Sequence, residues 1–138
     1  MLSCDIDRCE LKNAVISTIA QDGMMLEFIS NKTYELCMTA VAQSGHALQF
    51  VPTEFITEEL LITAVIQTGF ALKYIPVKDR TYKLCKLAVE KDGCSLRYAR
   101  GLPDEQFYEL AKCAIMVDRH ALQFVPYPTE ELYQLLYA

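Results

Sequence analysis

The two histidines are the first side chains to consider for acid–base or metal chemistry. His46 and His120 are the only histidines among 138 residues, and each occupies the same position of a segment that recurs along the chain. The two copies are three segments apart. Stacked helices pack about 8–10 Å apart, so three steps would separate the imidazoles by roughly 25–30 Å, too far for one metal ion or one acid–base pair. We therefore expect both histidines to fill a half-exposed structural position, held elsewhere by Met24, Phe70 and Cys94.

Six cysteines are the other candidates for metal binding or redox chemistry. They fall at none of the spacings typical of a disulfide framework or a zinc site. We therefore expect free thiols in a reducing cytoplasm. Cys37 and Cys85 stand at an apolar position where other copies have leucine or alanine, so we expect them in the core. Cys4 and Cys9 leave a ligand or redox role open.

Signatures of catalysis are absent from the sequence. It contains no G-x-S-x-G motif, no phosphate-cradling glycine loop and no Cys/His pair within one copy of the segment. We therefore expect no enzymatic activity and no cofactor. A hydrolase or metal site would require ligands that converge from different copies, and it remains an alternative.

The recurring segment defines five repeat units. Four copies read SGHALQFVPTEF (44–55), TGFALKYIPVKD (68–79), DGCSLRYARGLP (92–103) and DRHALQFVPYPT (118–129). Gly23, Gly45, Gly69 and Gly93 stand in register at spacings of 22, 24 and 24 residues, and Arg119 follows after 26. A unit of this size cannot bury an apolar face alone, whereas stacked units share one continuous core.

An apolar stripe with helical spacing precedes each glycine. In unit 3, Leu60, Leu61, Ala64 and Val65 lie at i, i+1, i+4 and i+5. Four units begin with a threonine that can cap a helix, three residues before a leucine: Thr33, Thr57, Thr81 and Thr129. In unit 5 we expect Asp104 to take this role. We expect each glycine to end the helix in the left-handed conformation, which Arg119 would adopt less comfortably.

A second, short element follows each glycine. Ala47, Leu48, Phe50 and Val51 have helical spacing and predict a short helix, although Leu48-x-Phe50 alone would also permit a strand. A proline ends this element in units 2, 3 and 5.

The predicted fold is all-α, an α-solenoid of about five helix-turn-short-helix repeats of roughly 24 residues. The whole chain, 1–138, forms one repeat domain. Its units cover approximately 5–30, 31–54, 55–78, 79–102 and 103–128, with a C-terminal half-unit at 129–138. No apolar run reaches the roughly 18 residues that a membrane span requires.

The pattern A-V-x-x-x-G-x-A-L-x-[FY]-[VI]-P carries a family resemblance. It stands as AVAQSGHALQFVP (40–52) and AVIQTGFALKYIP (64–76). The sequence resembles a domain-of-unknown-function repeat family of bacteria, including intracellular pathogens, and of giant viruses. The resemblance implies a tandem helical module that is sometimes joined to other domains in secreted effectors. It implies no activity and no catalytic residues.

A polar position lies between the leucine and the aromatic residue of every short element. It is occupied by Glu27, Gln49, Lys73, Arg97 and Gln123. Residues 73–100 carry eight basic and three acidic side chains, a net charge of 8 − 3 = +5, while the whole chain has −5, which leaves −10 for the rest. Such a basic block within an acidic chain can attract an acidic protein. The candidate partner-binding residues are Gln49, Lys73, Lys78, Arg80, Lys83, Arg97 and Arg100.

The sequence therefore predicts a non-catalytic protein–protein interaction scaffold whose partner has an acidic surface and docks across units 3 and 4. It could be a module of a bacterial effector. The alternative is binding of nucleic acid or another phosphate ligand through residues 73–100, which the acidic remainder disfavours. We expect a cytoplasmic protein, or one in the host cytosol if it is a secreted effector.

The half-unit at 129–138 bears on the oligomeric state. If Leu132 and Leu135 pack against Ala114 and Ile115 of unit 5, the protein is a monomer. If they stay uncovered, an end-to-end dimer would bury them. We favour the monomer.

Overall fold

The computed structural model describes residues 8–137, and within this range every element is helical. The α-helices are α1 (Arg8–Gln21), α2 (Tyr34–Gln43), α3 (Glu58–Gln67), α4 (Tyr82–Lys91), α5 (Asp104–Val117) and α6 (Glu130–Gln134). Each of the first five is followed by a 3-10 helix, namely η1 (Gly23–Phe28), η2 (Gly45–Phe50), η4 (Gly69–Tyr74), η6 (Gly93–Tyr98) and η7 (Arg119–Phe124). Three shorter 3-10 turns are η3 (Thr53–Phe55), η5 (Val77–Asp79) and η8 (Leu135–Tyr137).

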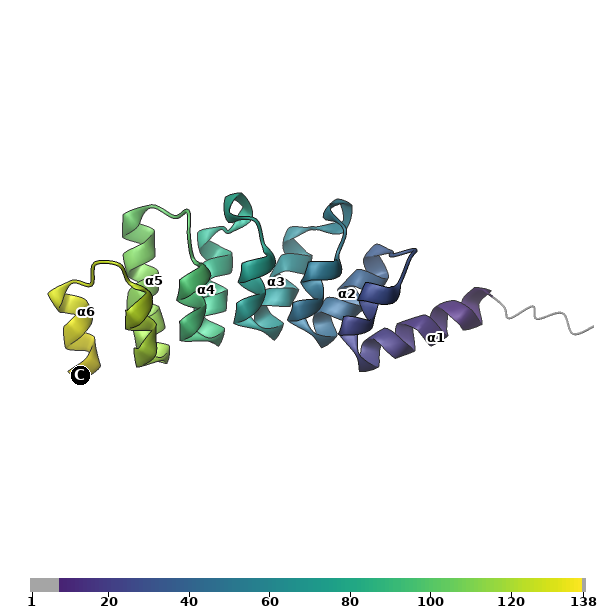
Figure 1. Cartoon of the computed structure of the whole chain (residues 1–138), viewed down its shortest axis with the longest axis horizontal. Helices are drawn as coiled ribbons and strands as arrows, with labels where there is room; N and C mark the ends of the chain where they lie inside the picture. Colours follow the sequence, from purple (N-terminus) through teal and green to yellow (C-terminus); the bar gives the residue numbers. More distant parts are fainter. Residues whose placement is uncertain (1–7, 138) are drawn as a thin grey trace, which may run out of the picture.

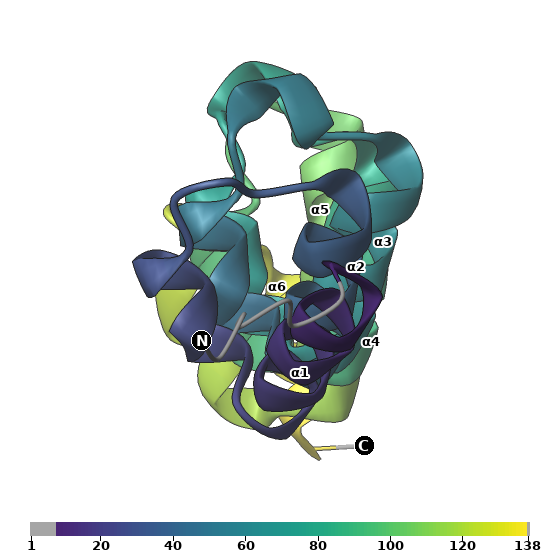
Figure 2. The same ribbon diagram turned by 90° about the vertical axis from the view of Figure 1, so that its right-hand side faces the viewer.

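The units stack in chain order. Figure 1 shows the helices side by side along the long axis, with α1 inclined at one end, and Figure 2 looks along the stack from that end. Helix α2 packs against α1 and α3, α3 against α4, and α4 against α5, while the short helices η1, η2, η4, η6 and η7 contact one another in the same succession. This is the pattern of an all-α solenoid, in which each unit contacts mainly its neighbours. The predicted fold class is confirmed, and the short element is a 3-10 helix rather than a strand.

Threonine begins four of the α-helices, as the sequence predicted. The Oγ1 atoms of Thr33, Thr57, Thr81 and Thr129 accept hydrogen bonds from the backbone N–H groups three residues later, at 3.3, 3.2, 3.3 and 3.4 Å. These bonds satisfy one of the free donors at each helix start. The prediction for Asp104 is wrong, because Pro103 is the N-cap residue of α5 and Asp104 is already its first helical residue.

The predicted apolar stripes form the core. Leu60, Ala64 and Val65 are completely buried, and Leu61 is nearly so. Equivalent residues of α2, α4 and α5 are buried in the same way, so one core runs through the stack. Among residues 8–137, no helix has both the length and the apolarity needed to span a membrane.

The repeat glycines do not have the conformation that we predicted. Among the described residues, Gly101 is the only one with a positive φ, at 85°. Each α-helix instead ends at a residue with extended backbone, such as Ser44 with φ −145° and ψ 117°, and the glycine begins the 3-10 helix that follows. A single extended residue thus links the α-helix to the 3-10 helix, where we expected a left-handed turn at the glycine.

Close packing between units explains why these positions hold glycine. A Cβ atom on Gly69 would lie 2.5 Å from the carbonyl oxygen of Ala88 in the next unit, and one on Gly93 would lie 2.5 Å from that of Ala114. Such distances are well inside van der Waals contact, so any side chain would push the units apart. The glycine is required by its neighbour in space rather than by its own φ angle.

Arg119 shows what replaces glycine at the last junction. Its side chain is exposed, and its Nη2 atom donates a hydrogen bond of 3.2 Å to the carbonyl oxygen of Leu136. Leu136 stands seven residues after the capping Thr129, as Ala64 stands seven residues after Thr57. The guanidinium therefore binds the same carbonyl that meets a glycine at the earlier junctions.

The ends of the stack are less buried than its middle. Ile19 is fully buried, whereas Leu11 and Phe28 are 56% and 73% exposed. At the other end Leu132 is buried, Leu135 packs against the core, and Tyr137 is exposed. The half-unit thus covers α5 and buries its first leucine.

Candidate partner-binding surface

The short helices form a surface on which polar side chains alternate with aromatic rings. The predicted polar position is exposed in every unit, and we call the surface around it the short-helix face; its members are Glu27, Gln49, Lys73, Arg97 and Gln123. The aromatic residues Phe50, Tyr74, Tyr98 and Phe124 flank this position and are half-buried. A half-buried ring beside an exposed polar group is common at protein interfaces, because it offers apolar contact area and a fixed orientation.

Contacts between units hold these rings in place. His46 meets Tyr74 of the next unit edge to face, with ring centroids 6.1 Å apart, and Phe70 meets Tyr98 in the same way at 6.2 Å. The predicted structural position of His46 is confirmed. His120 is instead exposed, and its Nδ1 atom lies 2.9 Å from Oδ1 of Asp118.

Two cations of the short-helix face lie against these rings. The Nζ atom of Lys73 lies 4.9 Å from the centroid of Tyr74, and the guanidinium carbon of Arg97 lies 5.1 Å from Tyr98 and 5.5 Å from Phe124. Contact with the face of a ring orients a guanidinium and leaves its N–H groups free to bind a carboxylate in the guanidinium plane. Arg97 is therefore held ready for an anionic group.

Five of the seven predicted partner-binding residues are cations without an ion-pair partner. Within the part of the chain that the structure describes, no carboxylate lies within the 4.0 Å limit of an ion pair from Lys73, Lys78, Arg80, Arg97 or Arg100. Lys83 differs, because its Nζ atom lies 3.3 Å from Oε1 of Glu58. Most of the basic side chains of residues 73–100 therefore have no ion-pair partner.

Arg80 is placed differently from the other predicted residues. Its Nε and Nη1 atoms donate hydrogen bonds of 2.7 Å to the carbonyl oxygens of Ile75 and Tyr98, and Nη2 donates one of 3.4 Å to Lys73. Arg80 is half-buried and ties unit 3 to unit 4. It supports the surface from within, so we leave it out of the group that contacts a partner.

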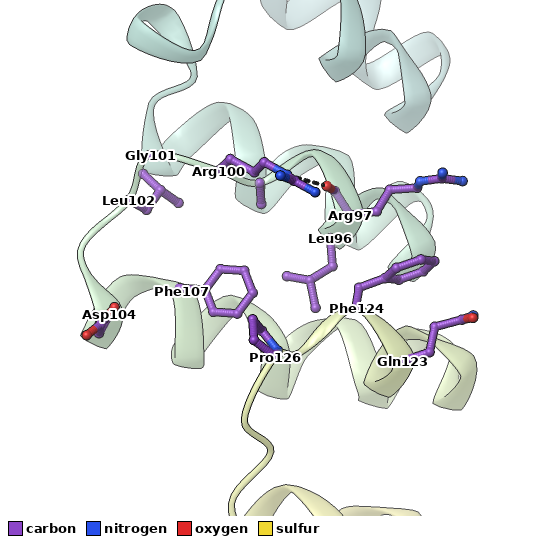
Figure 3. Close-up of a pocket in the computed structure, with 11 residues that line it drawn as sticks. Leu96, Arg97, Arg100, Gly101, Leu102, Asp104, Phe107, Gln123, Phe124 and Pro126 are labelled. Carbon is purple, nitrogen blue, oxygen red and sulfur yellow. Dashed lines mark hydrogen bonds between the residues drawn. The ribbon is translucent and has the colours of Figure 1, made fainter.

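A groove of about 530 Å³ opens between units 4 and 5. Figure 3 shows Arg97 and Arg100 on one side of it and Phe107 and Pro126 on the other. Leu96, Leu102 and Phe124 supply further apolar lining. The groove thus combines an apolar wall with the guanidinium group of Arg100, and the side chain of Arg97 extends along its rim beside Phe124.

The groove results from a departure of unit 4 from the repeat. Where units 2 and 3 have Pro52 and Pro76 followed by a 3-10 turn, unit 4 has Arg100 and Gly101. Gly101 has a φ of +85°, in the region that favours glycine, and α5 then begins at Asp104. The chain therefore takes a different path here.

Three possible metal ligands lie close together between units 4 and 5. A metal site, the alternative left open by the sequence, would require such ligands from different units. Ligand atoms of Asp92, Cys94 and Asp118 lie within 4.8 Å of one another. Both carboxylates already cap 3-10 helices, since they accept hydrogen bonds from the backbone N–H groups of Cys94 and His120 at 3.0 and 2.9 Å. The Cys94 thiol donates to Asp118 at 3.2 Å. These bonds account for the cluster as a capping arrangement.

The protonation of this cluster follows from its contacts. Burial raises the pKa of the Cys94 thiol to about 11, with further contributions from the hydrogen bond to Asp118 and from the negative charge of that carboxylate. Hydrogen bonds from the His120 backbone, the Cys94 thiol and the His120 ring lower the pKa of Asp118. The thiol is therefore protonated near neutral pH, and the carboxylate is ionised.

The other cysteines are placed largely as predicted. Cys37 and Cys85 are completely buried in the core, which confirms their structural role. Burial raises the pKa of Cys37, and it raises that of Cys85 to about 11. The hypotheses for Cys4 and Cys9 concern side chains outside the described part of the structure.

The groove residues Phe107 and Phe124 were not predicted as a site from the sequence. The signal was present in the missing proline at Arg100 and in the additional glycine that follows it. Both are departures from the repeat, whereas the predicted site was based on positions that recur in every unit.

The comparisons with known proteins concern the middle of the stack. No curated protein and no solved structure matches the chain. Residues 33–80, which include most of units 2 and 3, match a family described as Domain of unknown function (DUF4116). The expected resemblance to a domain-of-unknown-function family is thus confirmed over these residues.

Proposed function

We propose that the protein is a non-catalytic scaffold that binds an acidic partner protein through the short-helix face of units 3 and 4. The observation that supports this most is the position of Lys73 and Arg97, which are exposed, unpaired with carboxylates and held against aromatic rings. A cation that lacks an internal partner can attract an acidic surface at long range, and the neighbouring rings supply the contact area.

The experiment is a quantitative pull-down from native or host lysate with three forms of the chain. The first is the unchanged protein, the second carries Lys73→Glu and Arg97→Glu, and the third carries Lys86→Glu and Lys91→Glu on α4. The two double variants change the net charge equally, but only the first alters the short-helix face. We expect the first double variant alone to lose the partner. If both variants recover the same proteins as the unchanged chain, this surface is not the site.

Binding of single-stranded nucleic acid is a second candidate, because rings beside cations can stack on bases. The rings of Tyr74, Tyr98 and Phe124 lie beside Lys73 and Arg97. The net charge of −10 outside residues 73–100 makes this the weaker candidate. Titration of labelled single-stranded RNA and duplex DNA at low and moderate salt tests it, because phosphate binding weakens steeply as salt is added.

We further propose that the chain acts as a monomer in a reducing cytoplasm, including that of a host if it is delivered as an effector. The burial of Leu132 against unit 5 and the free thiols of Cys37 and Cys85 support this. Light scattering over a concentration series tests the first point. A dimer that Leu135→Glu dissociates without unfolding the chain would contradict it.

A further inference from the structure

We propose that the groove between units 4 and 5 binds an acidic segment of a partner protein, with a bulky apolar side chain inside the groove and a neighbouring carboxylate on Arg97 and Arg100. This inference rests on the proposed function and assigns a specific site to it. It follows from a comparison of the junctions within the stack.

One position fills the equivalent space at the earlier junctions. It is the residue directly before the capping threonine, and we call it the plug position; it is held by Lys32, Ile56 and Arg80. Lys32 donates from Nζ to the carbonyl oxygen of Ile29 at 2.9 Å, Arg80 donates to the carbonyls of Ile75 and Tyr98, and Ile56 packs against the core.

The plug is missing between units 4 and 5. Helix α5 begins at Asp104, three residues before the position that corresponds to the threonine, so the residue in register with Arg80 is Gln106. Gln106 lies within the helix and is exposed. Ala99 and Phe124, which are in register with Ile75 and Tyr98, line the groove instead. The space that the chain fills itself at the other junctions is thus left for another side chain.

The lining of the groove favours an apolar side chain there. Leu96 is buried at its base, and Leu102, Phe107 and Phe124 are half-buried and pack against the core (Figure 3). Ile56 shows that an apolar plug is compatible with this fold. A long cationic plug is disfavoured here, because one guanidinium group already lines the groove, another lies on its rim, and like charges repel.

The rim of the groove favours a carboxylate beside the apolar side chain. The guanidinium of Arg97 donates no hydrogen bond within the described part of the chain, and the one side-chain bond of Arg100 is from Nε to the carbonyl oxygen of Arg97 at 3.5 Å. A guanidinium with free N–H groups can bind a carboxylate through two parallel hydrogen bonds. Asp104 also lines the groove, and Figure 3 places it at the end away from Arg97.

A peptide selection tests the ligand class. A phage library of random 12-residue peptides is selected on the full chain and counter-selected on the chain carrying Arg97→Glu and Arg100→Glu. We expect enrichment of Asp or Glu next to Leu, Ile, Phe or Met. Enrichment of Arg or Lys, or no enrichment over the unselected library, would overturn the proposal.

Affinities of the selected peptides then test the site. The dissociation constants are measured by fluorescence polarisation. Each of the single variants Arg97→Gln, Arg100→Gln and Ala99→Ile should weaken binding about tenfold or more, and Lys86→Gln should leave it unchanged. Ala99→Ile gives unit 4 the residue that unit 3 has at Ile75, so it narrows the groove without changing the charge. Thermal unfolding checks that the variants fold.

The outcomes separate the two proposals. If Arg97→Gln weakens binding and Ala99→Ile does not, the acidic partner binds the short-helix face, and the groove assignment alone fails. If a 12-nucleotide single-stranded RNA displaces the peptides and binds more tightly at physiological salt, the surface recognises nucleic acid, and both proposals fail.

Discussion

A Cβ atom on Gly45 would lie 2.5 Å from the carbonyl oxygen of Ala64 in the following unit. This relationship recurs between Gly69 and Ala88 and between Gly93 and Ala114. The carbonyl belongs to the backbone of a buried helix, so it cannot rotate away as a side chain would. Main-chain atoms of adjacent units thus lie close together at these three junctions.

Gly45→Ala should therefore destabilise the protein strongly. Overpacking of a closely packed site typically costs about 1–3 kcal/mol, and we expect the upper part of this range because a backbone carbonyl must shift. Urea unfolding followed by circular dichroism measures the change. The matched control is Arg119→Ala at the equivalent position, where a side chain is already present. If the Gly45→Ala protein is as stable as the unchanged chain, the atoms at this junction can shift at little cost in free energy.

Ser95→Ala should stabilise the protein. Ser95 is completely buried, and its Oγ atom has no hydrogen-bond partner in the described structure, whereas Ala47, Ala71 and Ala121 hold the same position in other units. Removal of an unsatisfied buried hydroxyl should raise the free energy of unfolding by about 1 kcal/mol. The reverse change, Ala71→Ser, should lower it by a similar amount. A loss of stability in Ser95→Ala would mean that the hydroxyl does find a partner.

Arg80→Gln should lower the free energy of unfolding, whereas the same change at the nearby Lys78 should not. The variant loses a charged group that binds the carbonyl oxygens of Ile75, Tyr98 and Lys73. Hydrogen bonds to charged groups contribute about 1.5–3 kcal/mol each, and we expect a net loss of about 2 kcal/mol in urea unfolding because glutamine and water replace part of them. Lys78→Gln removes an exposed cation two residues away and should leave stability within about 0.5 kcal/mol.

The thiol of Cys94 should react slowly with iodoacetamide near neutral pH, although it is only half-buried. Only the thiolate reacts, and the pKa of Cys94 is raised to about 11. The rate should therefore rise about tenfold per pH unit up to that value. Asp118→Asn removes the carboxylate that favours the protonated thiol, so it should lower the pKa and speed alkylation at pH 8. Peptide mass spectrometry resolves Cys94 from the other cysteines. Equal rates in both proteins would contradict the role of Asp118.

The same pKa predicts a loss of stability in alkaline solution. In the unfolded chain the Cys94 thiol ionises near its ordinary pKa of 9.0, whereas the folded protein holds the proton to about 11. Between these values the folded state binds more protons, so its stability falls as the pH rises. Cys94→Ala should reduce this pH dependence in urea unfolding, and an unchanged slope would show that other groups dominate it.

The sequence predicted those features that depend on neighbouring residues along the chain. Thr57 and its equivalents cap helices because a hydroxyl three residues before a leucine reaches the free N–H group locally, and the stripe of Leu60 and Ala64 follows from helical periodicity. The reason for Gly45 was missed because it lies in another unit. The groove was missed because it depends on the path of the chain after Arg100 and on side chains of two units, which local patterns do not place. The isolated hydroxyl of Ser95 also becomes visible only when its surroundings are known.

The contact of each glycine with a backbone carbonyl bears on how such arrays change in length during evolution. The main-chain contact is the same at each of these junctions, and a side chain of the next unit lies close as well, Thr68 beside Gly45 and Ser95 beside Gly69. An additional copy of residues 55–78, inserted after unit 3, should present Gly69 to the carbonyl of Ala64 in the new copy, just as Gly45 meets it now. Duplication or deletion of whole units can therefore preserve the contact between the glycine and the carbonyl.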